Sequence, residues 1–142
     1  MTLKTLIRDG RGTGNLAEIS PVGELIVSGF GINTTKFNAL NVANTAFNFY
    51  IPESGQNFII TAIIYNTPAG SSTVDVYEAS SITSTTINKQ IFRIVTTGAT
   101  FAPLILSLGG FIPVTEGEFL NSKTDNPTVN MTIVGFYKPI IL

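Results

Sequence analysis

The sequence contains no cysteine, no histidine and no tryptophan. Without cysteine, disulfides and thiolate metal sites are excluded. Without histidine, the chain lacks the most frequent general base and the most frequent zinc ligand. The remaining residues show no acid–base or nucleophilic constellation in their spacing. We therefore expect a protein that is not an enzyme and that uses no cofactor or metal.

Charge is also scarce. Charged residues make up 12% of the 142 residues, with a net charge of −1, whereas about 25% is usual. The absence of a basic excess argues against nucleic acid as a partner. Either serine, threonine and asparagine supply the solvated surface, or neighbouring subunits cover part of it. We favour the second interpretation, because a free monomer with so few charges tends to self-associate.

Long apolar runs are missing as well. The runs that occur, such as 58–60 and 104–106, fall far short of the roughly 18 to 20 residues that a membrane helix needs. The N-terminus leads from Met1 through Lys4 to Arg8 and Asp9 instead of into an apolar signal segment. We expect no secretory signal and no membrane partner.

From residue 46 onward the sequence is typical of short β-strands. Apolar residues alternate with polar ones, and glycine, proline, asparagine and serine separate the runs. The Ser/Thr-rich residues 82–89 are expected to contain a short helical turn. The pattern predicts an all-β domain over 46–142, a β-sandwich of jelly-roll type, with strands at 47–51, 57–65, 73–78, 91–97, 101–108, 111–114, 118–122 and 128–137.

Residues 1–45 form a second region, made of an arm, a hairpin and a connector. The arm, 1–15, has glycines at alternate positions and little to bury. Residues 16–30 predict a hairpin around the turn Ser20-Pro21-Val22-Gly23, and 31–45 read as a polar connector. An isolated hairpin is marginal in water, so we expect it to lie on its own domain or on another subunit. The expected contact residues are Leu3, Leu6, Ile7, Arg8, Arg11, Leu16, Ile19, Leu25 and Val27.

Two sets of residues have the composition of known functional sites but lack the surrounding secondary structure that such sites need. The run Gly10-Arg11-Gly12-Thr13-Gly14 has the glycines of a phosphate loop, but no strong strand precedes it and no helix follows. Glu116 and Glu118 would share one strand face, whereas catalytic carboxylates normally come from separate elements. We interpret the first as part of the arm and the second as a solvated turn edge.

Two further sets favour structural roles. Asp75, Glu78 and Asp125 carry calcium-type ligands, but no loop has the density of oxygens that such a site needs. The four tyrosines could line a sugar platform, but a ring with one polar tip is equally useful at the ends of a sandwich or at subunit contacts. We favour the second role for Tyr50, Tyr65, Tyr77 and Tyr137.

Two segments resemble small virion proteins of tailed bacteriophages. Residues 9–19, DGRGTGNLAEI, and the ELIV of 24–27 are similar to the N-terminal segment of that group, and 49–60 and 74–79 are similar to its jelly-roll body. The resemblance implies a capsid decoration, or cement, protein, or a related head or tail component. Such proteins often form trimers.

In that interpretation the N-terminal segment docks on the shell or on a neighbouring subunit. The expected function is to stabilise a phage capsid surface as a homo-oligomer, a homotrimer on the resemblance. The expected partners are the major capsid protein or other virion subunits. The protein would be made in the host cytoplasm and located on the virion. The alternative is a receptor- or glycan-binding module of a phage tail or fibre.

Overall fold

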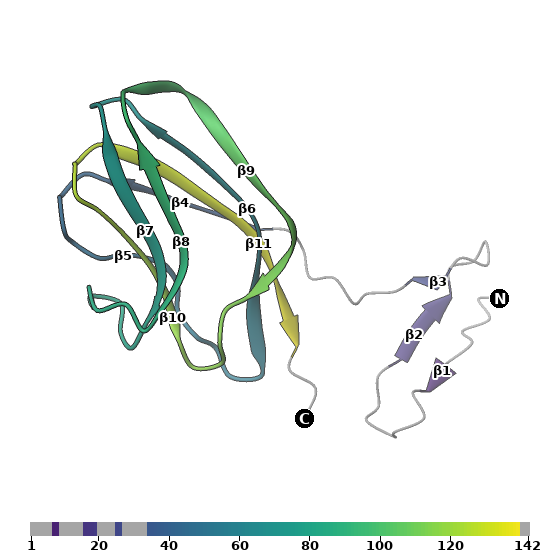
Figure 1. Cartoon of the computed structure of the whole chain (residues 1–142). Coiled ribbons are helices and arrows are strands. Elements are labelled where there is room, and N and C mark those ends of the chain that lie inside the picture. The colour runs from purple at the N-terminus through teal and green to yellow at the C-terminus, as the bar shows by residue number, and fades with distance from the viewer. Residues whose placement is uncertain (1–6, 9–15, 20–24, 27–33, 140–142) are drawn as a thin grey trace. The chain divides into compact units, whose positions relative to one another are not determined.

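The computed structural model describes residues 7–8, 16–19, 25–26 and 34–139. The chain divides into two compact units, Met1–Gly31 and Ile32–Leu142. No helix occurs among the residues that the structure describes, and every described element is a β-strand. The expected all-β class is confirmed (Figure 1).

The first unit contains a three-stranded antiparallel sheet in the order β1-β2-β3. Its strands are β1 (Ile7–Arg8), β2 (Leu16–Ile19) and β3 (Leu25–Ile26). The expected hairpin is confirmed in its pairing, since Ile19 lies opposite Leu25, while its turn lies outside the described residues. The segment expected as an arm contributes a strand of its own, because Ile7 pairs with Ala17.

The second unit is a β-sandwich of two four-stranded antiparallel sheets, β4-β11-β6-β9 and β5-β10-β7-β8. Figure 1 shows the two sheets as facing layers. The strands are β4 (Thr34–Leu40), β5 (Phe47–Tyr50), β6 (Gln56–Thr67), β7 (Ser72–Ala79), β8 (Lys89–Thr96), β9 (Thr100–Pro113), β10 (Phe119–Thr124) and β11 (Val129–Pro139).

The strand order follows from one long hairpin that is rolled up. Strand β7 pairs with β8, β6 with β9, β5 with β10 and β4 with β11. Successive pairs alternate between the two sheets, and the additional pairs β10–β7 and β11–β6 then complete each sheet. This order agrees with the expected jelly-roll arrangement, in which two sheets bury one face each.

The core lies between the sheets, where alternate side chains of the central strands point inward. Strands β6 and β11 supply most of one side, and β7 and β10 lie opposite them. The buried apolar cluster contains Leu40, Phe49, Tyr50, Phe58, Ile60, Ile63, Tyr65, Val74, Val76, Ile94, Val114, Leu120, Val129, Met131 and Ile133.

The expected polar connector contains strand β4, so the sandwich begins before residue 46. All seven residues of β4 pair with β11, and Leu40 at its end is fully buried. Its inward positions include Lys36 and Asn38, and its outward positions include Phe37. This pattern is opposite to that of an ordinary half-buried strand, which is why alternation did not identify it.

Two other expectations differ in detail. Residues 101–108 and 111–114 belong to one strand, β9, with an irregular register where Ser107 pairs with Ala62 and Ile112 with Ile60. Gly109, with a φ of +60°, lies in this irregular stretch. Pro103 lies on β9, an edge strand of its sheet, where proline is tolerated. No helical turn forms over the described residues 82–89. A single turn stands at their start, where the Ser84 amide donates a hydrogen bond to the carbonyl of Ser81 at 3.3 Å.

Candidate functional site

The N-terminal sheet holds five of the nine expected contact residues. Ile7 and Arg8 lie on β1, Leu16 and Ile19 on β2, and Leu25 on β3. Pairing places Arg8 opposite Leu16 and Ile19 opposite Leu25. The other four, Leu3, Leu6, Arg11 and Val27, lie outside the described residues.

The N-terminal unit, Met1–Gly31, is too small for a core of its own to supply its stability. Its strands are two to four residues long within Met1–Gly31. Chains below about 40 residues usually need disulfides, metals or association to fold, and the sequence has no cysteine. The sandwich, in contrast, has all eight of its strands within residues 34–139. The first unit is therefore the part of the chain that gains most from a binding partner.

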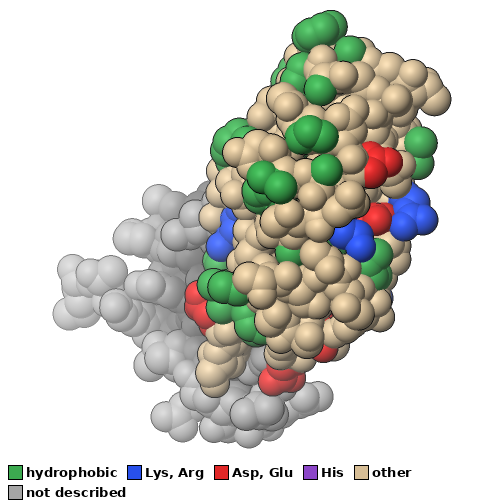
Figure 2. Space-filling model, turned by 90° about the vertical axis from the view of Figure 1, so that its left-hand side faces the viewer, with side chains coloured by type: hydrophobic (Ala, Val, Ile, Leu, Met, Phe, Trp, Pro, Cys, Tyr) green, Lys and Arg blue, Asp and Glu red, His purple; other side chains and the backbone are tan. Residues whose placement is uncertain are grey.

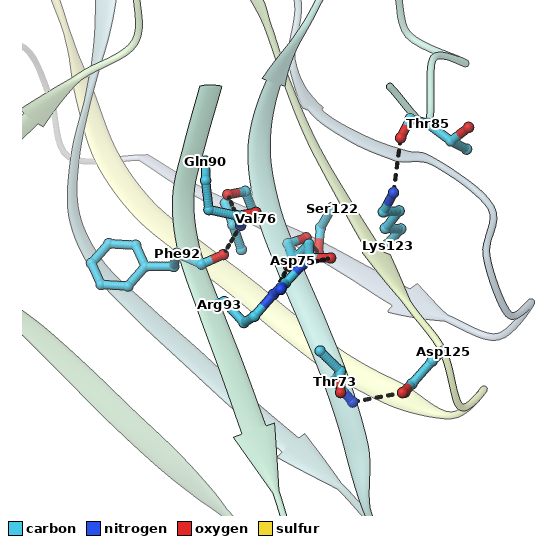
Figure 3. Close-up of polar contacts among 10 residues, drawn as sticks. All are labelled: Thr73, Asp75, Val76, Thr85, Gln90, Phe92, Arg93, Ser122, Lys123 and Asp125. Atoms are coloured by element: carbon cyan, nitrogen blue, oxygen red, sulfur yellow. Dashed lines mark hydrogen bonds and ion pairs between the residues drawn. The ribbon is translucent and has the colours of Figure 1, made fainter. Parts of the chain in front are cut away.

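The outward side of the β5-β10-β7-β8 sheet is polar and internally paired. The Arg93 guanidinium on β8 contacts Asp75 on β7 through two hydrogen bonds (Figure 3). Nε donates to Oδ1 at 2.7 Å, and Nη2 donates to Oδ2 at 3.1 Å. This bidentate hydrogen bonding raises the pKa of Arg93. Seen from the side on which β5 and β7 lie in Figure 1, acidic and basic side chains adjoin each other (Figure 2).

The connection between β7 and β8, residues 80–88, hydrogen-bonds to the same side. Tyr77 Oη donates to the carbonyl of Ser84 at 2.9 Å, and Asn121 Nδ2 donates to the same carbonyl at 3.1 Å. The Lys123 ammonium lies 5.4 Å from the Tyr77 ring centre and donates to the carbonyl of Thr85 at 2.9 Å (Figure 3). Tyr77 is consequently fully buried, and its hydroxyl serves the fold.

Alkaline solution should destabilise the sandwich through Tyr77. Burial, and secondarily the charge of Asp75, raise the pKa of Tyr77 from 10.0 to about 12. The unfolded chain therefore loses this proton first, and the free energy of unfolding falls between pH 10 and 12. In Tyr77→Phe the decline in urea midpoint over this window should be shallower, though not absent, because burial also raises the pKa of Tyr50. An equally steep decline in Tyr77→Phe and wild type would contradict this assignment.

Four of the acidic residues that the sequence analysis weighed as calcium ligands or catalytic groups are engaged in contacts within the sandwich. Asp75 pairs with Arg93, Glu78 with Lys89 Nζ at 3.1 Å, and Asp125 Oδ1 accepts from the Thr73 amide at 2.7 Å. Glu118 accepts from Asn88 Nδ2 at 2.8 Å. Among the described residues, no group of three or more acidic side chains is placed to hold a metal ion.

A groove of about 410 Å³ lies between the edge strands β4 and β5, which belong to opposite sheets. Its lining residues are Lys36, Phe37, Asn38, Asn48, Phe49, Ile51, Glu53 and Tyr137. Asn38 Nδ2 joins the two sheets by donating to the carbonyl of Asn48 at 2.7 Å. The groove combines three aromatic rings, amides and one charge of each sign, which suits a neutral polar ligand such as a sugar.

Lys36 is placed in this groove by aromatic rings. Its ammonium lies 5.3 Å from the centre of the Tyr137 ring and 5.9 Å from that of Phe58. Tyr50 stacks on Phe58 at 5.4 Å, so three rings form the adjacent end of the core. Sequence reasoning included the tyrosines among its candidates but missed Lys36 and Asn38, because it assigned them to a connector.

Neither a family model, a curated protein nor a solved structure matches this chain. Among the residues that the structure describes, there is also no helix long and apolar enough to cross a membrane.

Proposed function

We propose that this protein is a structural subunit of a virion, which decorates and stabilises a phage capsid surface as a homo-oligomer and docks through its N-terminal segment. The observation that carries the proposal is the division of the chain into an eight-stranded sandwich and a small three-stranded sheet within Met1–Gly31. Binding the assembled shell across subunit boundaries stabilises it by mass action relative to the dissociated subunits.

The low charge and the N-terminal resemblance also support this role. A sheet of short strands gains stability when it packs on a shell or continues a neighbour's sheet. The partners proposed are the major capsid protein or other virion subunits. The subunit needs no catalytic group for such work, and its polar network around Asp75 and Tyr77 is already committed to the fold.

Deletion of residues 1–31 should abolish docking and leave the sandwich folded. The described core belongs to the second unit, so far-UV circular dichroism and the melting transition of the deletion variant should remain those of a folded β-protein. Co-sedimentation with capsids that lack the subunit measures docking. The full chain should pellet with the capsids, and the deletion variant should remain in the supernatant.

Two outcomes would count against this proposal in different ways. If the deletion variant decorates capsids as well as the full chain, the N-terminal segment is not the docking element. If the full chain itself never co-sediments, the virion role fails. A shorter deletion of residues 1–15 separates the contribution of β1 from that of the β2–β3 hairpin.

The groove between β4 and β5 favours a second candidate function, a glycan-binding module of a tail or fibre. Specific and saturable binding on a glycan array, reduced by Lys36→Ala or Glu53→Gln, would favour it. Lys138→Ala is a matched control, because Lys138 is exposed on β11 and does not line the groove.

A further inference from the structure

The groove between β4 and β5 combines exposed apolar side chains with polar side chains that are half-buried. Phe37 on β4 is 63% exposed, and Ile51, which directly follows β5, is 54% exposed. Because β4 and β5 belong to opposite sheets, the groove has an apolar side chain on either side. Lys36, Asn38 and Asn48 are half-buried in the same lining. Such a site covers the C–H groups of a ligand and binds its polar substituents at a few fixed points.

Lys36 brings three hydrogen-bond donors to the groove and uses none of them within the described part of the chain. Its ammonium lies 5.3 Å from the ring centre of Tyr137 and 5.9 Å from that of Phe58. These contacts position the charge but supply no acceptor. No hydrogen bond or ion pair joins Lys36 to an acceptor among the residues that the structure describes. Glu53, in the same lining, accepts instead from Nε2 of Gln56. The donors of Lys36 are therefore available to a ligand.

The two asparagines of the lining offer the opposite chemistry. Asn48 Nδ2 donates to the carbonyl of Tyr50 at 2.9 Å and to Asn121 Oδ1 at 2.9 Å. Asn38 Nδ2 donates to the carbonyl of Asn48 at 2.7 Å. These bonds fix both amides, and no donor from the described residues reaches either side-chain oxygen. An amide oxygen accepts hydrogen bonds, so Asn38 and Asn48 suit hydroxyl groups of a ligand.

A sugar ring that carries a carboxylate satisfies both requirements. The carboxylate is an anionic acceptor for Lys36, and the hydroxyls are donors for the amide oxygens. Charge-assisted hydrogen bonds are about twice as strong as neutral ones, so the carboxylate should dominate the affinity. A phosphate group, with a charge of about −1.5 to −2, is less suitable, because the lining has one cation and also contains the Glu53 carboxylate.

The size of the groove favours a short ligand. Its volume of about 410 Å³ lies in the lower part of the range of about 300–1,000 Å³ that is usual for ligand sites. The end of a saccharide therefore fits better than a long chain segment.

We propose that this groove binds an acidic sugar. Its carboxylate accepts from Lys36 Nζ, its hydroxyls donate to the side-chain oxygens of Asn38 and Asn48, and Phe37 covers the C–H face of its ring. The proposal rests on the second candidate function, glycan binding, and narrows that function to acidic saccharides. It does not depend on docking through the N-terminal segment.

The first test compares each acid with its own neutral ester on the full chain. The ligands are the methyl glycosides of glucuronic acid, galacturonic acid and N-acetylneuraminic acid, and the methyl ester of each. In nuclear magnetic resonance titrations, at least one acid should shift the side-chain amide signals of Asn38 and Asn48 with a Kd of about 1 mM or lower. Its ester should bind about tenfold more weakly. Added salt should weaken binding of the acid and leave binding of the ester unchanged.

The second test uses two matched pairs of variants. Lys36→Gln should remove the difference between acid and ester, whereas Lys138→Gln should retain it, because Lys138 is exposed and does not line the groove. Phe37→Ala should weaken the acid and the ester by the same factor. Phe101→Ala should weaken neither, since Phe101 is 76% exposed but lies outside the groove. Thermal melting verifies that all four variants fold.

The outcomes separate this proposal from the functions proposed above. Equal affinity for acid and ester would overturn the acidic preference and leave glycan binding in place. No shift with any of these acids or esters up to about 10 mM, or shifts that arise only outside the groove, would overturn both. If Lys36→Gln does not fold, the comparison of acid with ester and the Phe37→Ala variant still decide. Capsid co-sedimentation judges the docking proposal independently.

Discussion

Replacement of Gly135 by alanine is expected to destabilise the sandwich by about 3 kcal/mol, the upper part of the usual range for overpacking. A Cβ atom at this position would overlap the carbonyl oxygen of Ile59 and lie 2.6 Å from Cζ of Phe58. The first neighbour is backbone of the adjacent strand and the second is a fully buried ring. Neither can move without shifting β6 or the core, so relief must come from separating the two central strands.

Local register explains why the strands approach so closely. Gly135 pairs with Ile60 and Val134 with Ala62, so Thr61 is an extra residue on β6 at this point. The irregularity brings the β6 backbone against the Gly135 Cα, which is tolerated only without a side chain.

Urea denaturation followed by circular dichroism measures this effect. Gly98→Ala is the matched control, because a Cβ added there has nothing within 4 Å, and its effect should stay within about 0.5 kcal/mol. If the two variants unfold at the same urea concentration, the close approach at Gly135 does not exist in solution. Gly135→Ala should also leave the slope of the transition unchanged if only stability is affected.

The second large effect is expected for Glu78→Ala, at about 2 kcal/mol. The Glu78 side chain is 2% exposed, and its Oε1 accepts hydrogen bonds from Lys89 Nζ at 3.1 Å and from the Thr115 amide at 2.9 Å. These bonds connect β7 to the start of β8 and to the loop before β10. Truncation removes a side chain that is almost fully buried and takes the acceptor from the partly buried hydrogen bond of the Thr115 amide.

Two variants identify the cause of the loss. Glu78→Gln retains an oxygen for the Thr115 amide and should cost about 1 kcal/mol, which reflects the lost ion pair. Glu118→Ala removes a half-buried carboxylate whose hydrogen bond with Asn88 is exposed to solvent, and it should cost less than about 0.5 kcal/mol. Equal thermal midpoints for Glu78→Ala and Glu118→Ala would refute the structural role of Glu78.

Several features of this protein could be predicted from its sequence because they depend on neighbouring residues. Alternation from Thr73 to Glu78 lies within β7, and 118–122 largely coincides with β10. The turn composition at residues 20–23 predicted the pairing of β2 with β3. These signals are local, since an alternating pattern needs only one buried face and a turn needs only its own backbone preferences.

Tertiary structure alone decided the remaining features. Strand β4 was hidden because its inward positions carry Lys36 and Asn38, whose burial depends on aromatic rings and a carbonyl from distant strands. The constraint at Gly135 arises from one extra residue on β6. Sequence periodicity reports which residues are buried, whereas register, which long-range pairing sets, decides which residues meet.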